Sequence, residues 1–175
     1  MPRYPPDRWF DYTSLGVPVK GTRLLPIKLP IPLEKSSNIP SHLRFTLDDL
    51  INCVQSYNQK LTCVIDLTYA KYYSPKFLHD NNISYHKIYV EGHAVPNSKN
   101  VEQFINMVNK ERKQSPARLV TICHHSCEYV PETFAGLLIL HAHSFTSRSS
   151  DTVAFLIDQS DILSPHIISI IISVL

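Results

Sequence analysis

Apolar residues recur at helical spacing in two stretches of the chain. The first follows Thr46, a residue type that caps helices, and Asp49 stands three positions later, as in a capping box. The second begins at Ser98 and ends in a basic cluster, which suits the negative carboxyl end of a helix. The apolar faces predicted for these two helices are Leu47, Leu50, Ile51, Val54 and Tyr57, and Val101, Phe104, Ile105 and Val108.

Three other stretches have the pattern of β-strands. Residues 61–67 are almost continuously apolar, which is typical of a strand that is buried on both faces. Residues 85–90 and 119–123 are expected to form two more. Strands that alternate with helices through short connections predict an α/β fold, in which helices flank a parallel or mixed sheet. Ligands of such sheets bind beyond the carboxyl ends of the strands, where Asp66 and Cys123 would lie.

Prolines and composition divide the chain into three predicted parts. Residues 1–23 are expected to be an extended lead-in, and residues 24–120 the α/β body. Three prolines interrupt residues 24–33, so this segment is expected to cross the surface without regular strand pairing. Residues 121–175 are rich in Ser and Ile, differ in composition from the body, and form a divergent C-terminal segment.

The charge is distributed unevenly along the chain. The 175 residues are 43% apolar, enough for one core, and carry a formal charge of only +2. Residues 1–120 hold 16 Lys/Arg against 10 Asp/Glu, a formal +6, whereas residues 121–175 hold 1 against 5, a formal −4. A basic body fits a polyanionic partner such as RNA, although a solvated surface explains such an excess equally well.

Four cysteines without a signal peptide indicate a reducing, intracellular compartment and free thiols. Cys53 and Cys63 fall in a helical and a strand pattern and are expected to be buried. No stretch reaches the roughly 20 apolar residues that a membrane span requires.

Four segments carry a resemblance to a known family: Arg8–Asp11, Gly21–Lys28, Ile65–Tyr73 and Gly92–Pro96. Over residues 8–120 the chain resembles the RNA 5′-triphosphatase branch of the dual-specificity cysteine phosphatases. Within that branch it is most similar to the RNA/RNP-complex-interacting phosphatases, and the triphosphatase domain of mRNA-capping enzymes is a cousin. The pairing of Asp-Leu-Thr…Tyr-Tyr with Gly-His-x-x-Pro is specific to this branch.

This resemblance implies a cysteine-phosphatase-like fold and the removal of terminal phosphates from RNA 5′-triphosphates through a cysteinyl-phosphate, without a metal or cofactor. It places Cys123 at the nucleophile and Asp66 at the edge of the active site. The expected partners are RNA 5′ ends and ribonucleoproteins, bound by a monomer in the nucleus or cytoplasm, with the nucleus favoured. The candidate phosphate- and RNA-binding residues are Arg23, Lys28, Lys71, Tyr72 and His93.

The chain departs from the family at the loop that performs the reaction. The family signature is His-Cys-x-x-Gly-x-x-Arg, but Ser126 stands at the glycine position and Tyr129 at the arginine position after Cys123. The arginine forks onto two phosphoryl oxygens and stabilises the transferred charge, which a neutral tyrosine cannot do. We therefore predict that this chain is inactive.

Three functional readings follow from this departure. The chain is an inactive phosphatase by descent, a pseudophosphatase that still binds RNA 5′ ends or ribonucleoproteins, or a non-functional variant polypeptide. Codons permitted for residues 121–132 can encode parts of the signature when shifted by two bases, so we interpret residues 121–175 as the product of another reading frame or exon.

Four of the candidate residues also have a purely structural interpretation. Asp66 could cap a turn, Lys28 could be a solvated surface lysine, Tyr72 could pack in the core, and His93 could fix a turn. A metal cluster is a weak further alternative, because structural zinc sites usually combine two separated ligand pairs. Its ligands would be Cys123, His124, His125 and Cys127.

Overall fold

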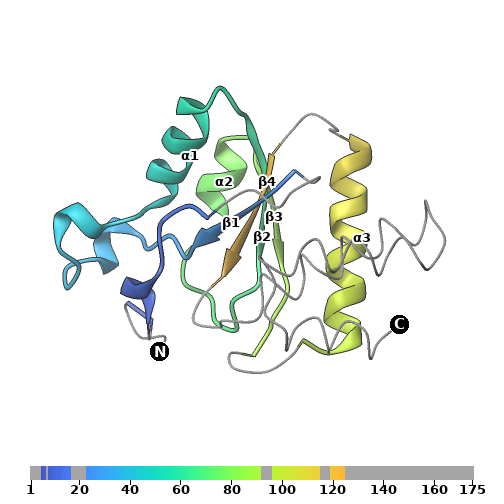
Figure 1. Cartoon of the computed structure of the whole chain (residues 1–175), viewed down its shortest axis with the longest axis horizontal. Helices are drawn as coiled ribbons and strands as arrows, with labels where there is room; N and C mark the ends of the chain where they lie inside the picture. Colours follow the sequence, from blue (N-terminus) through green and yellow to red (C-terminus); the bar gives the residue numbers. More distant parts are fainter. Residues whose placement is uncertain (1–4, 7, 17–22, 92–95, 115–118, 125–175) are drawn as a thin grey trace, which may run out of the picture. The chain divides into compact units, whose positions relative to one another are not determined.

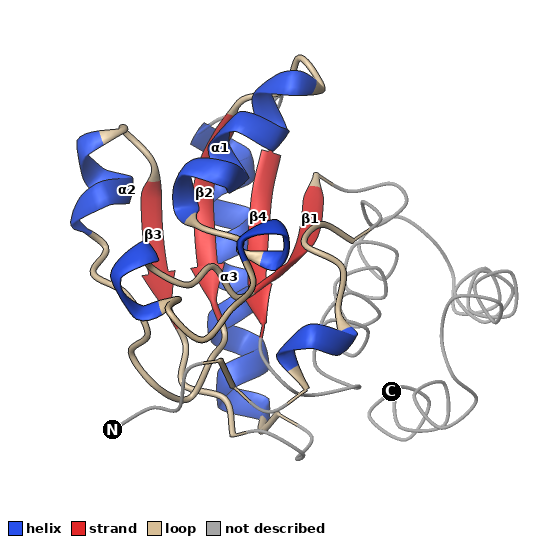
Figure 2. Ribbon diagram, turned by 90° about the vertical axis from the view of Figure 1, so that its left-hand side faces the viewer, coloured by secondary structure: helices blue, strands red, loops and turns tan. Residues whose placement is uncertain are grey.

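The computed structural model describes residues 5–6, 8–16, 23–91, 96–114 and 119–124, all within one compact unit, Met1–Cys127. The sheet consists of four parallel strands, β1 (Leu24–Lys28), β2 (Leu61–Asp66), β3 (Ser84–Lys87) and β4 (Leu119–His124), in the order β1-β4-β2-β3. The helices are α1 (Leu47–Ser56), α2 (Lys76–Asp80) and α3 (Ser98–Gln114), with short 3-10 turns at Trp9–Asp11, Leu33–Lys35 and Ser41–Leu43. Helices α1 and α2 cover one face of this sheet and α3 covers the other (Figures 1 and 2). The predicted α/β fold is confirmed.

The capping box predicted at Thr46 is present at the start of α1. The backbone N–H of Asp49 donates to Thr46 Oγ1 at 3.2 Å, and the backbone N–H of Thr46 donates to Asp49 Oδ2 at 2.8 Å. Leu50 and Val54 are buried as expected. Tyr57 is 69% exposed, contrary to the prediction, because the helix ends before it.

Replacing Thr46 by alanine is expected to lower the free energy of unfolding by about 1 kcal/mol, because one amide at the helix start loses its acceptor. Urea denaturation of the full chain measures this loss. Thr46→Ser is the matched control, since it keeps the capping hydroxyl and removes only the methyl group. An equal loss in both variants would show that the methyl group, and not the cap, stabilises this helix.

Strand β2 and helix α3 agree with their predicted patterns. Every residue of β2 is buried, as expected for a strand with neighbours on both sides and helices on both faces. Helix α3 begins at Ser98 as predicted, and Phe104 on its apolar face is fully buried. No helix in the described part of the chain combines the length and apolar character needed to cross a membrane.

The prediction for residues 24–33 was wrong in its local structure. Residues 24–28 form strand β1, which pairs with β4 along its whole length. Pro26 has no N–H to donate, but β1 is the last strand of the sheet, where a proline is tolerated. On its free side, the carbonyl of Pro26 accepts from Gly16 N–H at 2.9 Å and Lys28 N–H donates to the carbonyl of Ser14 at 3.0 Å. Residues 24–31 are buried, apart from the half-buried Pro26, and the chain reaches the surface only at Leu33.

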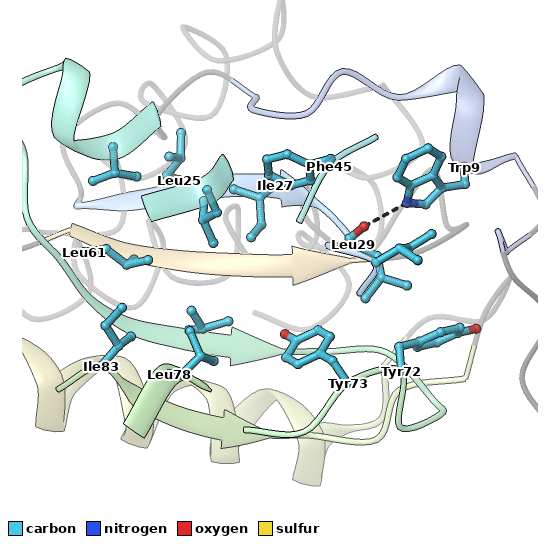
Figure 3. Close-up of a cluster of buried hydrophobic side chains, with 14 of the residues drawn as sticks. Trp9, Leu25, Ile27, Leu29, Phe45, Leu61, Tyr72, Tyr73, Leu78 and Ile83 are labelled. Carbon is cyan, nitrogen blue, oxygen red and sulfur yellow. Dashed lines mark hydrogen bonds between the residues drawn. The ribbon is translucent and has the colours of Figure 1, made fainter. Parts of the chain in front are cut away.

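The lead-in contributes to the core of the body. Trp9 is 2% exposed and packs with Ile27, Leu29 and their neighbours (Figure 3). Its indole N–H donates to the carbonyl of Leu29 at 2.8 Å, so the ring is fixed at one position. At the other end of the body, β4 crosses the boundary predicted after residue 120 and continues to His124.

Strand β3 is shorter than the predicted strand at 85–90. It pairs with β2 from Cys63 to Asp66, and Ile88 N–H donates one more bond to the carbonyl of Asp66 at 2.9 Å. Beyond that point β2 has ended, so the following residues have no neighbouring strand to pair with. Lys87 therefore lies at a strand end, level with Asp66.

Candidate functional site

The register of the sheet brings several candidate residues to one edge. Strand β4 lies between β1 and β2, and Cys123 is paired with Ile27 on one side and with Asp66 on the other. Lys28 is paired with His124 in the same way. Because all four strands are parallel, their carboxyl ends meet at this edge, where α/β sheets bind ligands. We call this the carboxyl edge.

An ion pair between Asp66 and Lys87 crosses the carboxyl edge from β2 to β3. Lys87 Nζ lies 2.9 Å from Asp66 Oδ1, and the two side chains are 11% and 1% exposed. The ammonium also donates to the carbonyl and hydroxyl oxygens of Thr68 and, at 3.0 Å, to the carbonyl of Ala70. It lies 5.2 Å from the ring centre of Tyr89 as well. Lys87 thus holds the loop after β2 against the end of β3.

The Asp66 carboxylate has further donors. Its Oδ1 accepts from the backbone N–H of Thr68 at 2.9 Å and from the Thr68 hydroxyl at 2.8 Å, and its Oδ2 accepts from the Tyr85 hydroxyl at 2.8 Å. The turn-capping contacts that the sequence allowed as an alternative are therefore present. A catalytic role for Asp66 remains a prediction, and any such role would act within this network.

Lys28 is buried instead of being solvated at the surface. Its Nζ lies 3.7 Å from the ring centre of Trp9, a cation–π contact, and the residue is 8% exposed. Burial lowers the pKa of this ammonium below its usual value. A role for Lys28 in phosphate binding remains a prediction.

The loop between β2 and α2 presents one candidate to solvent and buries another. Lys71 is exposed, three residues after the Thr68 turn. Tyr72 is 4% exposed and belongs to the hydrophobic core, where Figure 3 shows it beside Tyr73. The carbonyl of Tyr72 accepts from Lys35 Nζ at 3.4 Å. Tyr72 thus has the core position that was its structural alternative, and Tyr69 is the exposed aromatic ring of this loop.

One candidate lies away from the carboxyl edge, and another is not described by the structure. Arg23 precedes the first residue of β1 and so lies at the opposite, amino edge, where its Nη2 donates to Gln59 Oε1 at 2.8 Å. His93 falls outside the described residues.

Lys87 and Tyr85 were missed by the sequence analysis. They lie two residues apart in a strand pattern, so their side chains share one face. A lysine inside an apolar strand pattern is a signal for a buried ion pair, but its partner depends on which strand lies next to it. That neighbour, β2, became known only from the fold.

Known proteins resemble this chain in sequence over two thirds of its length. The RNA/RNP complex-1-interacting phosphatase of Bos taurus is 36% identical over 124 residues, which are 69% of this chain and 37% of that protein. Over about two thirds of its length, this chain is a homologue of the RNA/RNP complex-1-interacting phosphatases. The Caenorhabditis elegans homolog is 33% identical over 127 residues, which are 69% of this chain and 54% of that protein. The mRNA-capping enzyme of Mus musculus is 30% identical over 123 residues, which are 69% of this chain and 20% of the enzyme. No family model matches the chain.

Solved structures confirm the cysteine-phosphatase-like fold. The active form of Tk-PTP superposes with a TM-score of 0.54 over 93% of this chain and 95% of its own, at 10% identity. The core catalytic domain of a PP-IP phosphatase from S. cerevisiae gives 0.50 over 87% and 77%, at 11% identity. Such low identities establish the fold alone. In the sequence comparison, this chain spans a little over a third of the length of the mammalian phosphatases that it matches.

In this chain, a second cluster of reactive side chains lies between the sheet and α3. Cys63 on β2, His86 on β3 and Glu111 on α3 each offer a ligand-type atom, and these three atoms all lie within 4.8 Å of one another. His86 Nε2 and Glu111 Oε1 are 3.0 Å apart. Burial raises the pKa of the Cys63 thiol, and the neighbouring Glu111 carboxylate raises it further.

The raised pKa of Cys63 gives an expected pH dependence of stability. An unfolded chain ionises this thiol near pH 9.0, whereas the folded chain keeps its proton to higher pH. The contribution to stability is therefore fully present below that pH and is lost as the pH rises above it. From this thiol alone, the free energy of unfolding is expected to fall by up to about 1.4 kcal/mol per pH unit.

Urea denaturation at several alkaline pH values, in the presence of a chelator, measures this loss. Cys63→Ala removes the thiol, so its stability difference from the unmodified chain should shrink steadily above about pH 9. Cys53→Ala is the matched control, because Cys53 is a free cysteine that lies only partly buried on α1. A stability difference that stays constant with pH would contradict the assignment.

Proposed function

We propose that this chain is a catalytically silent relative of the RNA 5′-triphosphate phosphatases that still binds phosphorylated RNA 5′ ends at its carboxyl edge. One observation carries the proposal: β4 lies in the middle of that edge, and its last residues pair beside Asp66 and Lys28. In the fold of the cysteine phosphatases, the segment that leaves such a strand is in a position to surround a phosphate.

The silence follows from what this segment contains. After Cys123, Ser126 occupies the position of the family's glycine and Tyr129 that of its arginine. Glycine allows backbone N–H groups to converge on an anion, and arginine stabilises the charge that develops as the phosphoryl group transfers. A thiolate at Cys123 alone supplies neither of these.

Binding is supported by the cations at the carboxyl edge. Lys28 ends β1 at this edge and Lys71 is exposed on the loop that follows β2, whereas the charge of Lys87 is already paired with Asp66. The loss of the arginine removes transition-state stabilisation but leaves Lys28 and Lys71 in place. A terminal triphosphate carries more charge than any single internal phosphate of RNA, so it is the part of the molecule that these lysines attract most.

Comparing RNA with a 5′-triphosphate and the same RNA with a 5′-hydroxyl, at several salt concentrations, tests this proposal. The full chain is expected to bind the triphosphate RNA more tightly. Lys71→Ala is expected to reduce that preference, and to reduce the slope of log affinity against log salt concentration by about 0.7. Arg23→Ala is the matched control, because Arg23 lies at the amino edge. If Arg23 contacts the body of the RNA, this substitution is expected to weaken the binding of both RNAs equally.

Equal and weak binding of both RNAs at moderate salt would overturn the proposal. That result would favour the remaining reading, a non-functional variant polypeptide. Genomic DNA across the codons for Arg118 to Gly136 addresses its origin. If no frame or neighbouring exon contains a His-Cys-x-x-Gly-x-x-Arg sequence, residues 121–175 are not a displaced version of the family loop.

A further inference from the structure

The cluster of Cys63, His86 and Glu111 joins three elements that are distant in sequence. Two of its side chains come from adjacent strands, β2 and β3, and the third comes from α3, which covers that face of the sheet (Figure 1). It lies on the opposite face of the sheet from α1 and α2, and none of its members belongs to the ion pair of the carboxyl edge.

The three ligand atoms are of the types that bind zinc. A thiolate sulfur, an imidazole nitrogen and a carboxylate oxygen are all zinc ligands, and three protein ligands with one open position form a common tetrahedral site. The sulfur selects against Mg²⁺ and Ca²⁺, which take oxygen ligands. Tetrahedral zinc places its ligand atoms about 3.3–3.8 Å apart. The three ligand atoms now lie within 4.8 Å of one another, so small changes of side-chain torsion would bring them to this spacing.

Charge and burial favour a cation at this position. Cys63 is fully buried and the Glu111 side chain is 6% exposed, so an ionised thiol beside that carboxylate would place two anions in a nearly dry space. A divalent ion would neutralise both of them. The His86 side chain is 21% exposed, so an ion and a water ligand could enter the site from its side.

We infer that Cys63, His86 and Glu111 form a binding site for Zn²⁺ or a similar thiophilic divalent cation, with water as the fourth ligand. The ion would tie α3 to β2 and β3 and so stabilise the fold. Binding forms one bond to Cys63 Sγ as the thiol proton leaves to solvent, with no change of oxidation state. This site is independent of the proposed RNA function, because it lies on different residues and needs no phosphate.

Cobalt titration of the metal-free full chain tests this inference. Co²⁺ reports a tetrahedral thiolate site through its ligand-to-metal and d–d absorption bands. The titration uses a chain with Cys123→Ser and Cys127→Ser, which removes the Cys123–Cys127 cluster as a competing site. One Co²⁺ per chain is expected, displaced by Zn²⁺, with a melting temperature that rises with Zn²⁺ concentration.

Single substitutions in that background assign the ligands. Cys63→Ser is expected to abolish the thiolate band, whereas Cys53→Ser leaves it unchanged. Glu111→Gln is expected to weaken Co²⁺ binding at least tenfold while keeping the shape of the side chain and a hydrogen bond to His86. If Cys63→Ser fails to fold, His86→Gln and Glu111→Gln, each checked by circular dichroism, supply the decision.

Three outcomes would overturn the inference. They are the absence of a thiolate band, a band that survives Cys63→Ser in a folded protein, and an affinity that is unchanged in both His86→Gln and Glu111→Gln. In each case the cluster would be a hydrogen-bonded His86–Glu111 pair packed beside the Cys63 side chain, with no role in metal binding.

Discussion

Release of the γ-phosphate from 5′-triphosphate RNA by this chain is expected at no more than about a thousandth of the rate of an intact relative. Removal of one preorganised donor from a transition state already costs about 10²–10³ in rate, and this chain has lost both the arginine and the glycine of its loop. The remaining rate should not fall when Cys123 is replaced by serine. Quantified phosphate release from end-labelled RNA measures both.

An intact relative and its own nucleophile-to-serine variant, assayed under the same conditions, are the matched controls. They show that the assay detects cysteine-dependent transfer when it occurs. A rate for this chain comparable to that of the intact relative, abolished by Cys123→Ser, would contradict the expectation. The residues after Cys123 would then assemble a phosphate site without the family's arginine.

Replacing Lys87 by methionine is expected to lower the free energy of unfolding by about 3–5 kcal/mol, the largest single loss of stability that we expect. Asp66 would then be a buried carboxylate without its cation, and the loop oxygens of Thr68 and Ala70 would lose their shared donor. Urea denaturation measures the loss. Lys76→Met is the control, since Lys76 is exposed on α2 and has no such network.

A double-mutant cycle separates the ion pair from the other contacts. Asp66→Asn keeps one acceptor oxygen for the Thr68 donors, turns an NH2 donor toward the Tyr85 hydroxyl, which can accept, and removes the charge that faces Lys87. Lys87→Met combined with Asp66→Asn should therefore cost less than the sum of the two single changes, by about 0.5–3 kcal/mol. Strict additivity would show that Asp66 and Lys87 contribute separately, with no ion pair between them.

Local patterns in the sequence determined the elements whose stability is local. Thr46 and Asp49 predicted the start of α1, because a capping box involves only residues within one helical turn. The apolar run at Leu61–Asp66 predicted a strand buried on both faces, because a strand with one face in solvent would alternate apolar and polar residues. The α/β fold followed from the order of these elements, and Asp66 and Cys123 were expected at strand ends, where the backbone register places them.

The loop departure was also visible in the sequence alone. Ser126 and Tyr129 stand at the third and sixth positions after Cys123, where the family has glycine and arginine, and no fold is needed to see this. The proposal of catalytic silence therefore rests mainly on sequence, and the structure adds which strands lie beside the start of that loop.

Pairing between distant segments was decided by the tertiary structure. Residues 24–28 form a strand in spite of Pro26, because β1 is an outermost strand of the sheet and pairs with a neighbouring strand on one side only. Lys28 is buried because Trp9, which lies in the lead-in, packs over it, and Lys87 meets Asp66 because β3 lies next to β2. Cys63, His86 and Glu111 come together only when α3 covers the sheet. The sequence determined which residues were buried or charged, but strand order and helix placement, which depend on contacts across the whole chain, decided which of them meet.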